Sequence, residues 1–366
     1  MQYFDFHGLQ LSRLGLGCMR FPLLGTEQSE VDECATAQLI DHAISNGINY
    51  FDTAWPYHGG NSEKIIGRLL NKYPRSSYYL ATKYPGFNED NMKDPAAIFE
   101  KQLDNCQTDY FDFYLCHNVC ERNIGWFTDP KYSVVEYLIE QKKRGRIKHL
   151  GFSTHGSRAV IKRFLDTYGH ELSFCQIQLN YLDWSLQSAK EKVELLNNYR
   201  IPIWVMEPVR GGRLATLSDE RMEVLNSLRP GVSAPEWAFR FLQGIEGVCM
   251  VLSGMSNMDQ LTENISTFSQ LKPLTKTELS TVLNIANDMI AQNSVPCTAC
   301  SYCVDHCVQK LQIPGLIKAY NENTKPIDVG PSACIGCRRC EAVCPQGIKI
   351  SEIMAKFTQK LKENNS

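Results

Sequence analysis

Four side chains that can hold or move a proton follow short apolar runs of the sequence. Asp52 lies within one run and Tyr57 follows that run, while Lys83 ends the next run and His117 ends the one after that. Taken singly, each has an ordinary explanation: a capping aspartate, a solvated lysine or a histidine satisfied in the core. Their occurrence together at corresponding positions favours a shared chemical site.

The chemistry that joins these four residue types is the reduction of a carbonyl group. Hydride transfer to a carbonyl leaves an alkoxide, which a nearby acid must protonate. A tyrosine hydroxyl has a pKa of about 10 and is too weak an acid unless a neighbouring ammonium group stabilises its phenolate. An aspartate paired with that ammonium group keeps it in place, and a histidine can orient the carbonyl oxygen and relay protons.

Cysteines form a second candidate site near the C-terminus. Eight of the 15 cysteines fall between residues 297 and 344, in two runs with the same C-x2-C-x2-C-x3-C spacing. This is the spacing of bacterial ferredoxins with two [4Fe-4S] clusters, in which the fourth cysteine of each run ligates the other cluster. It predicts one ligand set of Cys297, Cys300, Cys303 and Cys344 and a second of Cys334, Cys337, Cys340 and Cys307. Zinc is the alternative, but structural zinc sites favour two C-x2-C pairs separated by a dozen or more residues.

The elements that must position the four proton-handling residues alternate along the chain. Short runs that are apolar on both faces indicate buried parallel strands, and they cover residues 14–19, 49–54, 78–83, 111–117, 149–154, 174–180, 202–208 and 248–254. Amphipathic stretches indicate helices at residues 35–46, 62–72, 95–105, 134–144, 158–168, 187–198, 235–242 and 276–292. Eight β/α units in a row fit a closed (β/α)8 TIM barrel better than an open sheet.

Two further segments complete the expected architecture. Residues 3–11 predict an N-terminal β-hairpin that closes the bottom of the barrel. The composition changes at residues 295–296, so we expect the barrel to occupy residues 1–294 and a small ferredoxin-like iron–sulfur module with a C-terminal helix to occupy residues 295–366. Because catalytic groups of such barrels lie at the C-terminal ends of the strands, the four side chains should meet at one rim.

The motifs around these residues resemble the aldo-keto reductase family. They read Phe-Asp-Thr-Ala-Trp-Pro-Tyr up to Tyr57, Thr-Lys at Lys83 and Leu-Cys-His-Asn around His117. The resemblance covers roughly residues 1–290 and is to the branch that carries a C-terminal ferredoxin-like domain. It implies a TIM barrel that binds NAD(P)H in an extended form, without a Rossmann domain. It also implies that Tyr57 is the general acid, that Lys83 and Asp52 tune its pKa, and that His117 orients the substrate.

The same resemblance implies a set of dinucleotide contacts. Ser153 or Thr154, with Gln178, would hold the nicotinamide carboxamide. The loops after the last two expected strands would hold the pyrophosphate and the adenosine end, through Met206, Glu207, Pro208, Gly211, Gly212, Leu214, Ser253, Gly254, Ser256, Gln260, Glu263 and Asn264. The family slightly favours NADPH, but residues 253–264 contain no lysine or arginine to meet a 2′-phosphate, so NADH stays open.

Composition and charge exclude several classes of function. With 43% hydrophobic residues the chain can build a core, which excludes disorder as its main state. A net charge of −2 gives no sign of nucleic-acid binding or of a polybasic membrane surface. Since no apolar run is long enough to span a membrane and the N-terminus has no secretory pattern, we expect a cytoplasmic protein. Its seven remaining cysteines would then be reduced, small core residues.

These observations predict an NAD(P)H-dependent reductase of aldehydes or ketones with an appended two-cluster electron-transfer module. The expected partners are a small carbonyl substrate and, as a further candidate, a redox protein such as a ferredoxin or a flavoprotein. Nicotinamide moves two electrons as hydride whereas each cluster moves one, and no flavin motif links the two. The alternative is a ferredoxin-like electron carrier or redox sensor in which the barrel is a docking scaffold. A third hypothesis gives the clusters a purely structural role.

Overall fold

A closed barrel of eight parallel strands forms the body of the molecule in the computed structural model, which describes residues 1–25, 27–292, 295–326 and 329–363. The strands follow one another around the barrel in chain order, and β10 closes it against β3. Their bounds are β3 Leu14–Gly17, β4 Tyr50–Asp52, β5 Tyr79–Tyr84, β6 Phe111–Cys116, β7 Ile147–Thr154, β8 Phe174–Gln178, β9 Ile203–Met206 and β10 Val248–Ser253. The predicted TIM barrel is therefore confirmed, and each strand lies within or close to an expected run.

The N-terminal hairpin closes one end of the barrel, as expected. Strands β1 (Tyr3–Phe6) and β2 (Leu9–Ser12) pair in antiparallel register. Phe4 and Phe6 from this hairpin pack on Trp204 inside the barrel, with ring centroids 5.7 and 5.0 Å away. This apolar plug fills the N-terminal end and leaves the opposite end for polar side chains.

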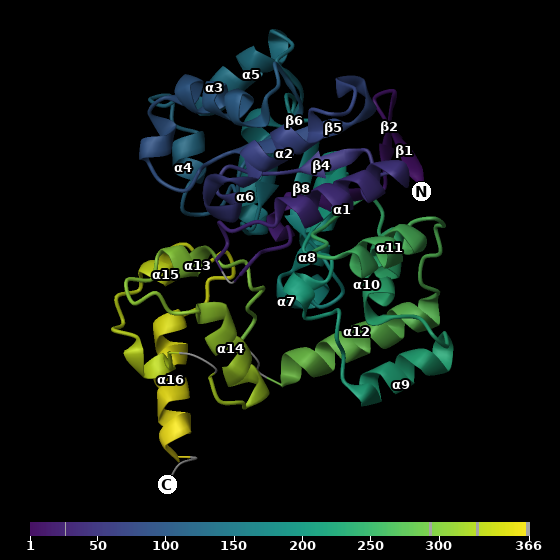
Figure 1. The fold of residues 1–366 in the computed structure, drawn as a ribbon, viewed down its shortest axis with the longest axis vertical. Coiled ribbons are helices and arrows are strands. Elements are labelled where there is room, and N and C mark those ends of the chain that lie inside the picture. The colour runs from purple at the N-terminus through teal and green to yellow at the C-terminus, as the bar shows by residue number, and fades with distance from the viewer. Residues whose placement is uncertain (26, 293–294, 327–328, 364–366) are drawn as a thin grey trace.

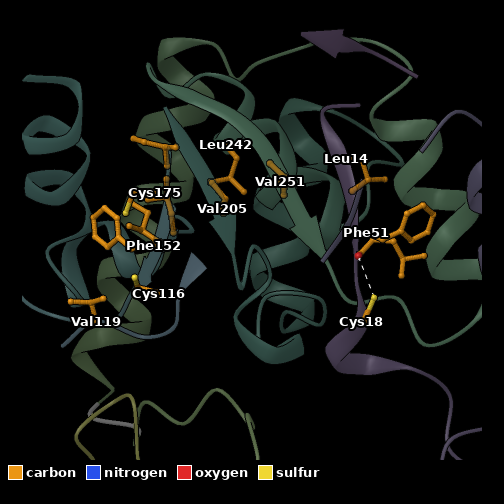
Figure 2. Close-up of a cluster of buried hydrophobic side chains, with 14 of the residues drawn as sticks. Leu14, Cys18, Phe51, Cys116, Val119, Phe152, Cys175, Val205, Leu242 and Val251 are labelled. Carbon is orange, nitrogen blue, oxygen red and sulfur yellow. Dashed lines mark hydrogen bonds between the residues drawn. The ribbon is translucent and has the colours of Figure 1, made fainter. Parts of the chain in front are cut away.

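A layer of apolar side chains joins the strands to the surrounding helices. Figure 2 shows part of it, with strand residues such as Phe51, Phe152 and Val205 and with Leu242 from a helix. Two cysteines outside the C-terminal runs, Cys116 and Cys175, are fully buried in this layer. They act there as small apolar residues, as predicted. The same prediction is wrong for Cys34, which is exposed.

Helices surround the barrel between successive strands (Figure 1). The expected ones are present as α1 Glu33–Ser45, α2 Ser62–Leu70, α3 Pro95–Cys106, α5 Val134–Lys143, α6 Arg158–Tyr168, α8 Ala189–Asn198, α10 Ala234–Gln243 and α12 Lys276–Ala291. Four further helices were not predicted from the sequence: α4 Ile124–Phe127, α7 Asp183–Leu186, α9 Asp219–Leu228 and α11 Met258–Thr267. Helix α9 buries only Leu225 among its residues, so its apolar periodicity is too weak to recognise.

The C-terminal module is a separate small core beside the barrel. Its helices are α13 Tyr302–Asp305, α14 Ile313–Glu322, α15 Arg339–Ala342 and α16 Ile350–Glu363. In Figure 1 this yellow-green module lies below the barrel, with α13 and α15 on the side facing it and α16 running away from it to the C-terminus. The boundary expected between residues 294 and 295 touches residue 294, which lies outside the described residues. Within the described part of the chain, no helix is long and apolar enough to cross a membrane.

Candidate active site

Alternation along the strands explains why the polar residues face one cavity. Tyr50, Phe113 and Trp204 point into the barrel with the plug. Asp52 lies two residues after Tyr50 on β4, so its side chain points inward one layer nearer the C-terminal rim. Lys83 shares this inward direction with Ala81 on β5. The structure therefore brings the predicted side chains of these strands to the same rim.

Distances within the tetrad (Asp52, Tyr57, Lys83 and His117) are those of a connected polar group. The Lys83 Nζ donates to Asp52 Oδ1 at 2.6 Å, to the Thr53 carbonyl at 2.8 Å and to the Tyr57 hydroxyl at 3.4 Å. The Tyr57 and His117 rings meet edge to face with centroids 6.1 Å apart. All four tetrad residues are at most 8% exposed. A carbonyl group placed against Tyr57 and His117 would therefore be shielded from bulk water.

Burial controls protonation within the tetrad. It raises the pKa of Tyr57 well above its ordinary value, and the nearby charges of Asp52 and Glu207 raise it further. Burial also lowers the pKa of His117 well below its ordinary value, and Lys83 adds to this effect. Both residues are thus neutral near pH 7. Tuning by Lys83 and Asp52 was expected to favour the phenolate, whereas here desolvation is the larger effect and keeps Tyr57 protonated.

A cavity of about 330 Å³ extends from the tetrad along the rim. All four tetrad side chains line it, with twelve of the fifteen predicted dinucleotide contacts: Ser153, Met206, Glu207, Pro208, Gly211, Gly212, Ser253, Gly254, Ser256, Gln260, Glu263 and Asn264. Buried acceptors without a partner among the described residues, Asn118 Oδ1 and Glu207 Oε2, lie at or near this rim. An elongated cavity with unused polar atoms fits an extended dinucleotide.

Three of the predicted dinucleotide contacts lie outside the set that lines this cavity. The Thr154 hydroxyl donates to the Val119 carbonyl at 2.6 Å, and Leu214 is fully buried. The Gln178 amide donates to Asp183 Oδ2 at 2.6 Å, and its oxygen accepts from Gln346 Nε2 at 2.8 Å. Gln178 is therefore already engaged by a residue of the C-terminal module, which the sequence did not reveal.

One glycine of the loop after β9 has a structural role that the sequence did not reveal. Gly211 has a φ of +63°, and a Cβ atom there would lie 1.9 Å from the Thr298 carbonyl oxygen. A Cβ on Gly212, at a φ of +98°, would meet open space. Gly211 is thus required by the approach of the C-terminal module, while Gly212 leaves room on the cavity side.

The eight cysteines of the two runs surround two small cavities in the module. One is lined by Cys297, Cys300, Cys303 and Cys344 and the other by Cys307, Cys334, Cys337 and Cys340, the two sets that the spacing groups. Each quartet encloses a cavity. A space enclosed by four thiols fits a cluster of several atoms better than one zinc ion bound at about 2.3 Å from each sulfur.

The module contacts the barrel rim through hydrogen bonds that the sequence did not reveal. Arg20 donates to the Thr298 and Ala299 carbonyls, at 3.4 and 2.8 Å. Gln346 accepts from Gln187 at 2.9 Å and from Arg210 at 3.3 Å. The side chains of Cys300 and Tyr302 line the same cavity as the tetrad. In the sequence, the feature that could have pointed to Tyr302 was a bulky aromatic residue between two cluster cysteines.

A buried ion pair supports this part of the rim. Arg210 Nε donates to Asp183 Oδ1 at 2.9 Å, and both side chains are 0% exposed. The carboxyl of Glu207 lies nearby, where burial and the Asp183 charge raise its pKa to about 7, although Arg210 and Arg20 act in the opposite direction. Glu207 is thus a titratable group in the cavity wall.

The fold and site together define a (β/α)8-barrel oxidoreductase with an attached iron–sulfur domain. The model of the Aldo/keto reductase family matches residues 13–287, and that of the 4Fe-4S dicluster domain matches residues 296–348. The chain belongs to the aldo/keto reductase family, and it carries a C-terminal 4Fe-4S dicluster domain. Membership implies NAD(P)H as the cofactor and a carbonyl compound as the substrate.

Known relatives agree with this assignment. The uncharacterized oxidoreductase YqkF of Bacillus subtilis is 28% identical over 301 residues, which cover 74% of this chain and 91% of the relative. The NADH-specific methylglyoxal reductase of Escherichia coli is 27% identical over 226 residues, 56% of this chain and 66% of the relative. The structure of aldo-keto reductase AKR11C1 from Bacillus halodurans, in its holo form, is 25% identical, with a TM-score of 0.61 over 78% of this chain and 95% of that one.

Proposed function

We propose that this protein reduces an aldehyde or ketone to the alcohol with NAD(P)H, and that Tyr57 is the general acid. The observation that carries this proposal is the buried contact of Lys83 with both Asp52 and the Tyr57 hydroxyl at the cavity wall. Bound NAD(P)H would supply the hydride. The chain's own groups would supply the proton and hold the carbonyl in place.

Each tetrad residue has a defined task in this proposal. Tyr57 is protonated near pH 7 and gives its proton to the oxygen that becomes the alcohol. Lys83 stabilises the phenolate that remains, and Asp52 holds Lys83 at 2.6 Å. Neutral His117 donates a ring N–H to the carbonyl oxygen and so orients it toward Tyr57.

The dinucleotide would lie along the twelve cavity-lining positions named above. Glu263 and Gln260 line the end assigned to the adenosine, where they can bond ribose hydroxyl groups. Arg20 also lines the cavity, but its guanidinium group bonds two carbonyls of the module. Because like charges repel, the Glu263 carboxylate at this end disfavours a 2′-phosphate, so we propose that NADH serves at least as well as NADPH.

Replacement of the Tyr57 hydroxyl tests the proposed reaction. Tyr57→Phe should lower kcat for carbonyl reduction by about 10²- to 10⁴-fold, the usual contribution of a general acid, without changing iron content. Tyr181→Phe is the matched control, since Tyr181 is buried, does not line the cavity and has a hydroxyl with no partner among the described residues. Unchanged turnover in Tyr57→Phe would overturn the proposal.

We further propose that the module, residues 295–366, holds one [4Fe-4S] cluster in each cysteine quartet. Bound clusters would supply one-electron transfer. The second quartet is the outer one: Cys337 is exposed, and Ile335 and Val308 beside it are 63% and 46% exposed. These exposed apolar residues support the second candidate function, in which the chain carries electrons for, or senses the redox state of, a partner protein.

The two candidate functions make different predictions for the same variant. If the protein is a reductase, Tyr57→Phe removes its cellular function although its clusters are intact. If it is an electron carrier or redox sensor, cells with Tyr57→Phe behave like wild type. Iron and sulfide analysis of anaerobically purified protein should give about eight of each per chain for two such clusters.

A further inference from the structure

The wall of the carbonyl site opposite the barrel comes from the first cysteine run. Cys300 lines both the barrel cavity and the cavity of the first quartet, so the two cavities share a wall. Tyr302, the first residue of α13, also lines the barrel cavity. The ring of Tyr302 lies 6.0 Å from Phe87, whose ring in turn lies 4.9 Å from His117. Aromatic groups from both parts of the chain thus close the cavity beside the tetrad.

The side chain of Tyr302 lines the cavity that holds the tetrad. The Tyr57 hydroxyl in the same cavity accepts a hydrogen bond from Lys83 at 3.4 Å. Tyr302 and the group that we assign as the acid therefore border the same space, in which a carbonyl compound would lie.

Two barrel residues fix the position of the loop that leads to Tyr302. Arg20 of the barrel holds the Thr298 and Ala299 carbonyls just before Cys300. Gly211 allows the Thr298 carbonyl to approach to a distance that no side chain would permit. Because these contacts involve backbone atoms of the cysteine loop, the loop has a defined place on the rim.

We propose that Tyr302 of the iron–sulfur module is part of the carbonyl site, where its ring limits substrate size. The inference rests on the proposed reductase function. It makes the iron–sulfur module a structural component of the substrate pocket, whether or not electrons pass between the two. The substrates expected are small aldehydes and ketones without a bulky group next to the carbonyl.

Two substitutions test the role of the ring. Tyr302→Ala removes the wall, so the ratio of kcat/KM for biphenyl-4-carbaldehyde to kcat/KM for propanal should rise about tenfold or more. Tyr302→Phe keeps the ring, so that ratio should stay within about twofold of the wild-type value. A ratio of two rates on one preparation does not depend on the fraction of folded enzyme.

Controls keep the result specific to the wall. Tyr320→Ala removes a ring from the same module, where it packs on Phe357 at 5.6 Å, and should leave the ratio unchanged. Iron content measured on each variant tests whether the module is intact. If wild type reduces propanal but the ratio is the same in Tyr302→Ala and wild type, the inference is wrong and the reductase function stands. If wild type reduces neither aldehyde nor any other carbonyl with either nicotinamide, the proposed function itself fails.

Discussion

Replacement of Lys83 by methionine should cost the barrel a large part of its stability. The ammonium group of Lys83 is 1% exposed and pairs with Asp52, which is 3% exposed. Methionine fills a similar volume but leaves the Asp52 charge buried without its partner. Breaking one side of a buried ion pair typically costs about 3–5 kcal/mol. For a barrel of roughly 290 residues this corresponds to a melting temperature lowered by about 5–8 °C.

The loss should depend on pH in a defined direction. Burial already raises the pKa of Asp52, and Lys83 is the main influence that lowers it. Without Lys83 the pKa of Asp52 in the folded state rises further above its unfolded value of about 3.9. A carboxyl with a raised folded pKa destabilises the protein as the pH climbs from the unfolded value through the folded one. The difference between variant and wild type should therefore be small near pH 4.5 and largest at pH 7–8.

Thermal unfolding of anaerobically purified protein, followed by far-UV circular dichroism, measures this difference. Cluster absorbance, recorded in parallel, reports the module separately. The double variant Asp52→Asn, Lys83→Met removes both charges and should recover most of the lost stability while remaining inactive. Equal melting temperatures for Lys83→Met and wild type at pH 7.5, or no recovery in the double variant, would refute the account of this pair.

Four further outcomes are expected. Gly211→Ala should displace the module, because the new Cβ would lie 1.9 Å from the Thr298 carbonyl oxygen, and limited proteolysis of the module's loops should become faster. Gly212→Ala, the control, has similar backbone strain without such a contact and should leave proteolysis slow. Glu263→Lys should raise the NADPH-to-NADH ratio of kcat/KM about tenfold or more, since a cation then meets the 2′-phosphate. Burial holds the pKa of His117 well below its ordinary value, so kcat/KM should show no histidine limb between about pH 5.5 and 7.5. Anaerobic chelation of iron should loosen the first cysteine loop and shift aldehyde selectivity toward that of the opened pocket.

Local pattern was enough to locate the barrel and its tetrad. A strand that is covered on both faces has apolar side chains at odd and even positions alike, so a polar residue at its end stands out. Asp52 and Lys83 are two such residues. Closure of eight such strands then dictates that their ends meet. The two cysteine quartets could also be predicted from the sequence, because a fixed spacing of ligands reflects the geometry of the group that they hold.

The contacts between the barrel and the C-terminal module could not be predicted from the sequence. Gln178 was expected to face the nicotinamide, but it pairs with Gln346, which is 168 residues away along the chain. Gly211 looked like a phosphate-loop glycine, whereas its missing side chain makes room for Thr298. Docking of two domains is set by the fit of whole surfaces, and no periodicity or spacing within either domain encodes it.

The unequal placement of the two quartets limits how the module can act on the barrel. Ile350 lines both cysteine cavities, so they are neighbours, and only the first also adjoins the carbonyl site through Cys300. Electrons from a partner would therefore enter at the exposed second quartet and reach the barrel only through the first. Since hydride carries two electrons and each cluster exchanges one, such a route needs a mediator that splits the pair. Shaping the pocket through Tyr302 needs no mediator, and it accounts for the close fit between the first cysteine loop and the rim.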